Sequence, residues 1–190
     1  MRLISTKQCK TKYFSANEQS INLLGSYIVD SIRSCNVKDS TPVILCIGTD
    51  RATGDCLGPL VGEQLMDYND AYKVLGCLRA PVHALNIHQT IRSIYQSIEN
   101  PFIIAIDAAL GDSSHIGYVT VSNCPISPGK GVNKKLPAIG DLSITGIVNV
   151  SGQNAQLLQT TRLYTVMQLA NCIATALKYS IDYLEDFGLL

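Results

Sequence analysis

The sequence lacks the features that assign many proteins to a class at first sight. No stretch reaches the roughly 18 consecutive apolar residues that a membrane-spanning helix needs. Lys and Arg together number 15 and Asp and Glu number 15, so no net positive charge exists to hold nucleic acid or an anionic membrane. We therefore expect neither a membrane span nor direct binding to nucleic acid.

Motifs of common enzyme classes are also missing. The chain has no GxSxG nucleophile elbow, no Walker A loop and no GxGxxG fingerprint. Its seven cysteines include no CxxC pair, and their odd number and apolar surroundings predict reduced thiols that act as small core residues. Because no apolar stretch follows the polar N-terminus, we expect no secretory signal and a cytoplasmic location.

What is present favours a folded domain with a substantial core. Hydrophobic residues make up 46% of the 190-residue chain and charged residues 16%, which is typical of a globular protein rather than a disordered one. The length predicts one domain over residues 1–190. Residues 1–14 show no clear hydrophobic period, so we expect an irregular N-terminal segment there.

The apolar spacing alternates between helical and strand patterns. Helices are predicted at residues 15–34, 57–66, 87–98 and 163–177, the first opened by a capping box from Ser15 to Glu18. Strands are predicted at residues 43–47, 74–78, 102–106, 116–121 and 142–150, with 116–121 near an edge. This alternation predicts an α/β fold with a mostly parallel sheet and helices on both faces.

Two aspartates fall where such a sheet places its catalytic groups, beyond the carboxyl ends of its strands. Asp107 directly follows the strand at 102–106, and Asp55 lies in the loop after the strand at 43–47. Taken singly, Asp55 could be a helix N-cap and Asp107 a turn residue. Taken together, they are expected to share one proton, with Asp55 as the base and Asp107 as the acid.

The loop around Asp55 supplies the other candidate residues. We expect Gly48, Thr49, Asp50 and Gly54 to bind substrate or to stabilise an oxyanion through their amides. His115 is a weaker candidate for a metal ligand or proton carrier, since an exposed loop histidine is the simpler interpretation. No metal and no other cofactor is predicted.

Two stretches resemble the signatures of the spore germination protease (GPR) family. They are Ile-Gly-Thr-Asp-Arg-Ala-Thr-Gly-Asp-Cys-Leu-Gly-Pro at residues 47–59 and Ala-Ile-Asp-Ala-Ala at residues 105–109. Pro-Gly-Lys-Gly-Val at residues 128–132 is also similar, and the sequence is most similar to the YyaC-type sporulation proteins. The resemblance implies a phosphorylase/hydrolase-like three-layer α/β/α fold and a more distant relation to the hydrogenase maturation endopeptidases.

The same resemblance implies roles for individual residues. In germination proteases the two matching aspartates are the catalytic pair, so Asp55 and Asp107 take that role, with small acid-soluble spore proteins as the implied substrates. In the maturation enzymes, the matching acidic positions and a later histidine hold a metal. This chain is shorter than germination proteases, and Gly54 stands where the maturation enzymes usually carry another acid.

Three functions therefore stay open. The first is an aspartate-dependent endopeptidase that acts on a peptide or small protein in sporulation or germination. The second is a catalytically silent relative that binds a peptide or protein partner in the same cleft. The third is a metal-dependent endopeptidase of the maturation type.

Overall fold

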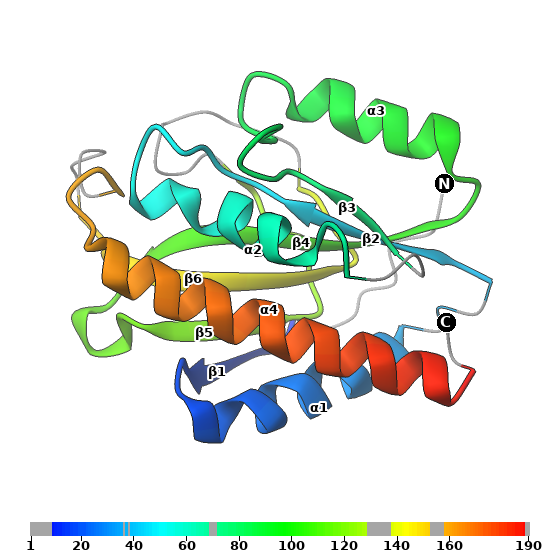
Figure 1. The fold of residues 1–190 in the computed structure, drawn as a ribbon, viewed down its shortest axis with the longest axis horizontal. Coiled ribbons are helices and arrows are strands. Elements are labelled where there is room, and N and C mark those ends of the chain that lie inside the picture. Colours follow the sequence, from blue (N-terminus) through cyan, green and yellow to red (C-terminus); the bar gives the residue numbers. More distant parts are fainter. Residues whose placement is uncertain are drawn as a thin grey trace.

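The computed structural model describes residues 9–35, 37, 39–68, 72–128, 138–152 and 158–188. At its centre lies a six-stranded sheet with the strand order β1-β5-β6-β4-β2-β3 (Figure 1). The strands are β1 (Thr11–Ser15), β2 (Thr41–Cys46), β3 (Lys73–Leu75), β4 (Pro101–Gly111), β5 (Tyr118–Ser122) and β6 (Leu142–Val150). The β3, β2, β4 and β6 strands pair in parallel, while β5 is antiparallel to both β1 and β6.

Helices cover both faces of this sheet. They are α1 (Glu18–Ser34), α2 (Leu57–Leu65), α3 (Ile87–Ser97) and α4 (Leu163–Asp186), with short 3-10 turns η1 (Gly54–Cys56) and η2 (Ser113–His115). The α1, α2 and α4 helices lie on one face and α3 lies on the other (Figure 1). The predicted three-layer α/β/α architecture with a mostly parallel sheet is confirmed. No helix in the described part of the chain is both long enough and apolar enough to cross a membrane.

The central strands are buried on both faces, as their continuous apolar runs predict. In β4, Ile104 and Ile106 belong to the larger apolar cluster under α1, α2 and α4, whereas Ile103 and Ala105 belong to the smaller cluster under α3. Successive side chains of a strand point to opposite faces of the sheet. An unbroken apolar run therefore serves two cores at once.

The N-terminal segment differs from the prediction. Residues 11–15 form the edge strand β1, so the expected irregular segment is wrong there, and residues 1–8 lie outside the described part of the chain. In β1 only Phe14 is buried, while Tyr13 is exposed. A single buried side chain produces no hydrophobic period that can be recognised in the sequence. The strand predicted at 116–121 lies near an edge as expected, since β5 is next to the edge strand β1.

The first helix begins at a different cap from the one predicted. Asn17 is the N-cap of α1, and its side chain accepts a 2.9 Å hydrogen bond from the amide of Ser20. The Ser15 hydroxyl lies 3.0 Å from the hydroxyl of Ser20 instead. Ser15 cannot cap the helix because it still belongs to β1.

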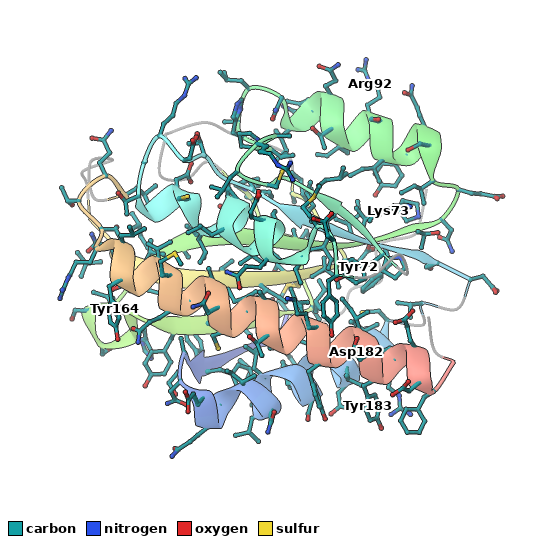
Figure 2. The ribbon with its side chains drawn as sticks, in the orientation of Figure 1. Tyr72, Lys73, Arg92, Tyr164, Asp182 and Tyr183 are labelled. Atoms are coloured by element: carbon teal, nitrogen blue, oxygen red, sulfur yellow. A yellow bond between two sulfur atoms is a disulfide. The ribbon has the colours of Figure 1, made fainter. Side chains whose placement is uncertain are left out.

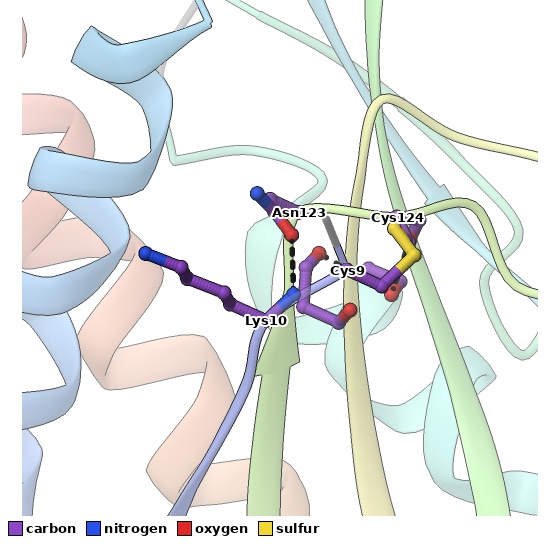
Figure 3. The surroundings of a disulfide bond; sticks show 6 residues. Cys9, Lys10, Asn123 and Cys124 are labelled. Carbon is purple, nitrogen blue, oxygen red and sulfur yellow. Dashed lines mark hydrogen bonds between the residues drawn. A yellow bond between two sulfur atoms is a disulfide. The ribbon is translucent and has the colours of Figure 1, made fainter. Parts of the chain in front are cut away.

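A disulfide joins the start of β1 to the segment after β5. Cys9 and Cys124 are bonded, and beside them the amide of Lys10 donates a 2.9 Å hydrogen bond to the side-chain oxygen of Asn123 (Figure 3). The prediction that all cysteines are reduced is wrong for this pair, because spacing cannot show that two cysteines 115 residues apart meet across an antiparallel strand pair. Five other cysteines are free, and four of them are buried.

Candidate functional site

Asp107 lies inside β4 rather than at its end. The strand continues to Gly111, because β6 runs alongside it as far as Val150. Alternation along β4 places Asp107 on the same face of the sheet as Ala105, the face that α3 partly covers. The side chain is partly buried, and its Oδ1 accepts a 2.8 Å hydrogen bond from the amide of Ala108.

Asp55 reaches the same edge of the sheet from the loop that follows β2. The loop is closed by the amide of Thr49, which donates to the main-chain carbonyl of Asp55 over 3.1 Å. Gly48 has φ +144, and a Cβ there would overlap the same carbonyl oxygen. Only glycine therefore fits this position, since the backbone conformation and the contact both exclude a side chain. Asp55 does not cap α2: the N-cap is Cys56, and it makes no side-chain cap hydrogen bond.

The two carboxyl groups interact and differ in acidity. Burial raises the pKa of Asp107 well above its usual range, and the negative charge of Asp55 raises this pKa further. Burial also raises the pKa of Asp55, but hydrogen bonding from the Thr49 backbone and the charge of His83 oppose that rise. Asp107 consequently holds a proton at a pH where Asp55 is ionised. The structure thus brings the predicted pair together, and its catalytic role stays a prediction.

The predicted oxyanion donors are largely occupied. The amide of Gly48 donates a 2.8 Å hydrogen bond to the carbonyl of Val82, and the amide of Thr49 is bonded to Asp55. Asp50 is exposed on the loop. The Gly48 and Thr49 amides therefore have no free N–H to offer a substrate in this conformation.

Gly54 joins the loop to the segment that precedes α4. A Cβ on Gly54 would meet the Leu158 carbonyl at 2.9 Å and the Thr161 hydroxyl at 2.9 Å, so glycine allows the two segments to touch. The site consequently lies at the end of α4 that Tyr164 marks in Figure 2, far along the helix from Asp182. At that distant end, the Tyr68 hydroxyl donates a 2.7 Å hydrogen bond to Asp182.

A pocket of about 180 Å³ is lined by the part of β4 that follows Asp107, beginning at Ala109. Its polar lining includes three threonines, Thr11, Thr120 and Thr145, together with Tyr13 and His115. Thr145 is the register partner of Asp107 on β6, so the pocket begins at the strand next to this carboxyl group. The hydroxyls of Thr120 and Thr145 lie 2.7 Å apart.

His115 belongs to this pocket and not to the aspartate pair. Its ring packs against those of Tyr13 and Tyr118, with centroids 5.0 and 5.4 Å away. Its charge is not among those that change the pKa of Asp55 or of Asp107. Nowhere in the described ranges do three His, Cys, Asp or Glu side chains gather closely enough to hold a metal ion. The structure therefore does not join His115 to the carboxylates as a ligand set.

His83 is the residue near the pair that sequence reasoning missed. It follows Val82, which forms a parallel β-bridge with Ile47 at the end of β2. This bridge adds a third segment to the edge of the sheet that carries Asp55 and Asp107. No local pattern marks His83, because its place depends on the bridge between Val82 and Ile47.

Comparison with known proteins gives the chain a family. The model of the family described as "Protein of unknown function (DUF1256)" matches residues 12–176. The chain belongs to this family. It is also 49% identical over 137 residues to the uncharacterized protein YyaC of Bacillus subtilis (strain 168), a match that covers 71% of this chain and 67% of the relative. The predicted similarity to YyaC-type proteins is confirmed.

One solved structure with a related layout is the NiFe hydrogenase maturation protease HycI from Thermococcus kodakarensis KOD1. The match covers 80% of this chain and 99% of that protein, with a TM-score of 0.49 and 18% sequence identity. The relation to germination proteases stays a prediction from the signature stretches.

Proposed function

We propose that this protein is a peptidase in which Asp55 and Asp107 activate a water molecule for attack on a peptide carbonyl. The observation that carries the proposal is the interaction of two partly buried carboxyl groups that come from separate segments of the chain. A structural role for both would leave their mutual repulsion unexplained. Paired carboxyl groups with unequal pKa values supply one acid and one base at the same pH.

The chemistry assigns a different task to each aspartate. Asp55, the more acidic member, accepts a proton from water as the water oxygen bonds to the carbonyl carbon. Asp107 gives its proton to the carbonyl oxygen, so the tetrahedral intermediate forms without a separate oxyanion hole. When the C–N bond breaks, the amine leaves with the proton from Asp55, and the hydroxyl of the intermediate returns its proton to Asp107.

The pocket beside Asp107 gives the substrate a place to bind. Thr145 and Thr120 carry their hydroxyls on the same face as Asp107, within a hollow that is open to solvent. A peptide that presents its carbonyl to the aspartates can extend across β6 towards β5, where these hydroxyls would bond its polar groups. The cleft would therefore bind an extended segment rather than a small metabolite.

The signature stretches at residues 47–59 and 105–109 favour a germination-type enzyme among peptidases. On that basis the substrates are small acid-soluble spore proteins, and the protein acts in sporulation or germination. The substrate class and the biological stage both belong to this proposal.

A second candidate function has one observation in its favour. Because the amides of Gly48 and Thr49 are occupied, these two groups cannot serve as the N–H donors that many acyl-transfer enzymes use. A catalytically silent relative that binds a peptide in the same cleft would need no N–H donors to stabilise an oxyanion. This candidate predicts peptide binding without turnover.

Incubation of the purified protein with small acid-soluble spore proteins, followed by mass spectrometry of the products, tests the proposal. The Asp55→Asn and Asp107→Asn variants are run beside it, with Asp186→Asn as the matched control because Asp186 is exposed at the far end of α4. Defined fragments from the wild type and the control alone are expected. Equal cleavage by all four proteins would overturn the aspartate mechanism, and binding without fragments would favour the silent relative.

A further inference from the structure

The disulfide between Cys9 and Cys124 closes the N-terminal end of the edge strand β1 (Figure 3). Cys9 lies shortly before β1, and Cys124 lies shortly after β5, the strand with which β1 pairs. Because β1 is the outermost strand of the described sheet, β5 is its neighbour on one side alone. The covalent bond therefore joins an edge strand to its partner strand just beyond their paired residues.

The two ends of β1 are held in different ways. At the end next to α1, Phe14 is buried in the larger apolar cluster. At the other end, residues 9–13 are all exposed. Hydrogen bonds between Lys10 and Asn123 lie there beside the disulfide. Burial of an apolar side chain thus secures one end of the strand, and the covalent bond secures the other.

The exposed end of β1 forms one wall of the pocket of about 180 Å³. Thr11 and Tyr13 line the pocket from β1, the strand of its lining that is farthest in the sheet from β4. The ring of Tyr13 packs against that of His115, with centroids 5.0 Å apart. Both β1 residues of the pocket lie between Cys9 and Phe14. They therefore belong to the part of the strand that the disulfide secures.

The disulfide is also the pair of cysteines that a reductant can reach. Cys9 is exposed and Cys124 is half-buried, whereas four of the five free cysteines are buried. The fifth, Cys35, is half-buried at the end of α1. Exposed disulfides are reduced more readily than protected ones and are often regulatory. The solvent access that thiol–disulfide exchange needs is thus found at the end of β1.

We propose that the Cys9–Cys124 disulfide is a redox-sensitive link, which a dithiol opens in the folded protein and whose opening releases the exposed end of β1 with its wall of the pocket. A thiolate of the dithiol bonds to one sulfur of the pair as the S–S bond breaks, and the second thiol of the dithiol then displaces the bound cysteine. Each cysteine sulfur gains one electron and one proton, and the dithiol is oxidised to a disulfide. The opening of this bond does not depend on the proposed peptidase function.

Opening the link should loosen one end of β1 and leave the centre of the sheet intact. A cross-link stabilises mainly by restricting the open chain, so its loss favours the open state of the segment that it closed. Residues 9–13 bury little apolar surface to oppose opening, whereas β2 and β4 contribute to both apolar clusters. We therefore expect hydrogen exchange to accelerate by roughly 10- to 100-fold in the exposed end of β1 and to stay unchanged in β2 and β4.

Hydrogen exchange of the full-length protein, measured by mass spectrometry of peptic fragments, tests both steps. The wild type is measured in the oxidised form and after incubation with dithiothreitol, a dithiol, while circular dichroism confirms that the protein stays folded. Alkylation of the new thiols identifies the cysteines that were released. The double variant Cys9→Ser/Cys124→Ser removes the bond without a reductant. Cys35→Ser is the matched control, because Cys35 is a free cysteine.

The expected result is alkylation of Cys9 and Cys124 in the folded protein, with faster exchange in residues 9–13 and in their partner segment 120–122. The double variant should behave like the reduced wild type, and Cys35→Ser like the oxidised one. If the bond opens only when the whole protein unfolds, or if β1 is equally protected without it, the proposal is overturned. Exchange that accelerates equally in β2 and β4 would also overturn it, since the bond would then stabilise the entire fold. A protein that cleaves no peptide still gives each of these results.

Discussion

The two faces of the sheet differ in the side chains that they carry. The face under α1, α2 and α4 is closed by apolar side chains such as Ile144 and Leu169, both with no exposed surface. On the other face, α3 covers β2 and part of β4, while the β1–β5–β6 half carries a row of polar side chains beside Asp107. The row consists of Tyr13, Thr120 and Thr145, which are neighbours in the strand register.

The difference has a physical reason. Burial of apolar surface gives about 25 cal/mol per Å², so the closed face supplies most of the stability. A buried carboxyl group is costly unless it is bonded or protonated. The apolar face stabilises the sheet without Asp55 and Asp107. The polar face can therefore contain these two carboxyl groups although their burial and mutual repulsion are unfavourable.

The largest expected effect concerns the polar face. Asp107→Asn should reduce peptide turnover by about 10²- to 10⁴-fold, since it removes the proton donor of the pair. The circular dichroism spectrum should stay unchanged, because the carboxamide keeps the shape of the side chain. Turnover within twofold of the wild type would mean that the carboxyl group of Asp107 takes no part in peptide hydrolysis.

The next effect concerns the closed face. Leu169→Ala should lower the free energy of unfolding by about 2–5 kcal/mol, because it leaves a cavity among fully buried side chains. Urea denaturation measures this change. Leu163→Ala is its control on the same helix, since Leu163 is 57% exposed, and the comparison fails if both variants lose equal stability.

A third prediction uses the raised pKa of Asp107. The folded state binds this proton more tightly than the unfolded state, where the pKa is about 3.9. The stabilisation is therefore complete below that value and is lost as the pH rises through the folded pKa. Asn cannot ionise, so Asp107→Asn should gain stability relative to wild type as the pH rises from 3 to 8.

Thermal unfolding across this pH range provides the measurement. A stability difference between the two proteins that does not vary with pH would show that Asp107 titrates alike in both states. Asp186→Asn, at an exposed position, should show no such trend.

The smallest expected effect is that of Thr145→Val. The substitution removes the partner of the Thr120 hydroxyl, 2.7 Å away, and should lower stability by about 1 kcal/mol. If the pocket binds the peptide, KM should rise while kcat changes little. An unchanged KM would limit the substrate site to the aspartates themselves.

Local patterns were sufficient for most of the layers. The four predicted helices and the buried strands β2, β4 and β6 are present, because each has an apolar period or run that survives in isolation. The strand β1 was missed, since one inward Phe14 makes no period. The continuation of β4 past Asp107 was missed as well, because three of its four residues, Ala108, Ala109 and Gly111, are small, and their strand conformation depends on pairing with β6.

The candidate site also has residues that the sequence could predict and residues that it could not. Asp55 and Asp107 could be selected from the sequence, because both follow apolar runs that end at one edge of a parallel sheet. The Cys9–Cys124 disulfide and the place of His83 could not, since each depends on pairing between segments distant in the chain.

The sequence by itself determined the α/β layers and the pair of acidic positions, because hydrophobic periodicity and strand order act through near neighbours. Only the tertiary structure shows which surroundings favour the proton on Asp107, a choice that the sequence predicted on other grounds. That choice depends on burial, on the Thr49 backbone and on the charge of His83, which the fold brings to Asp55 across a β-bridge. The acidity of a side chain is a property of its surroundings in space, and a linear pattern does not contain it.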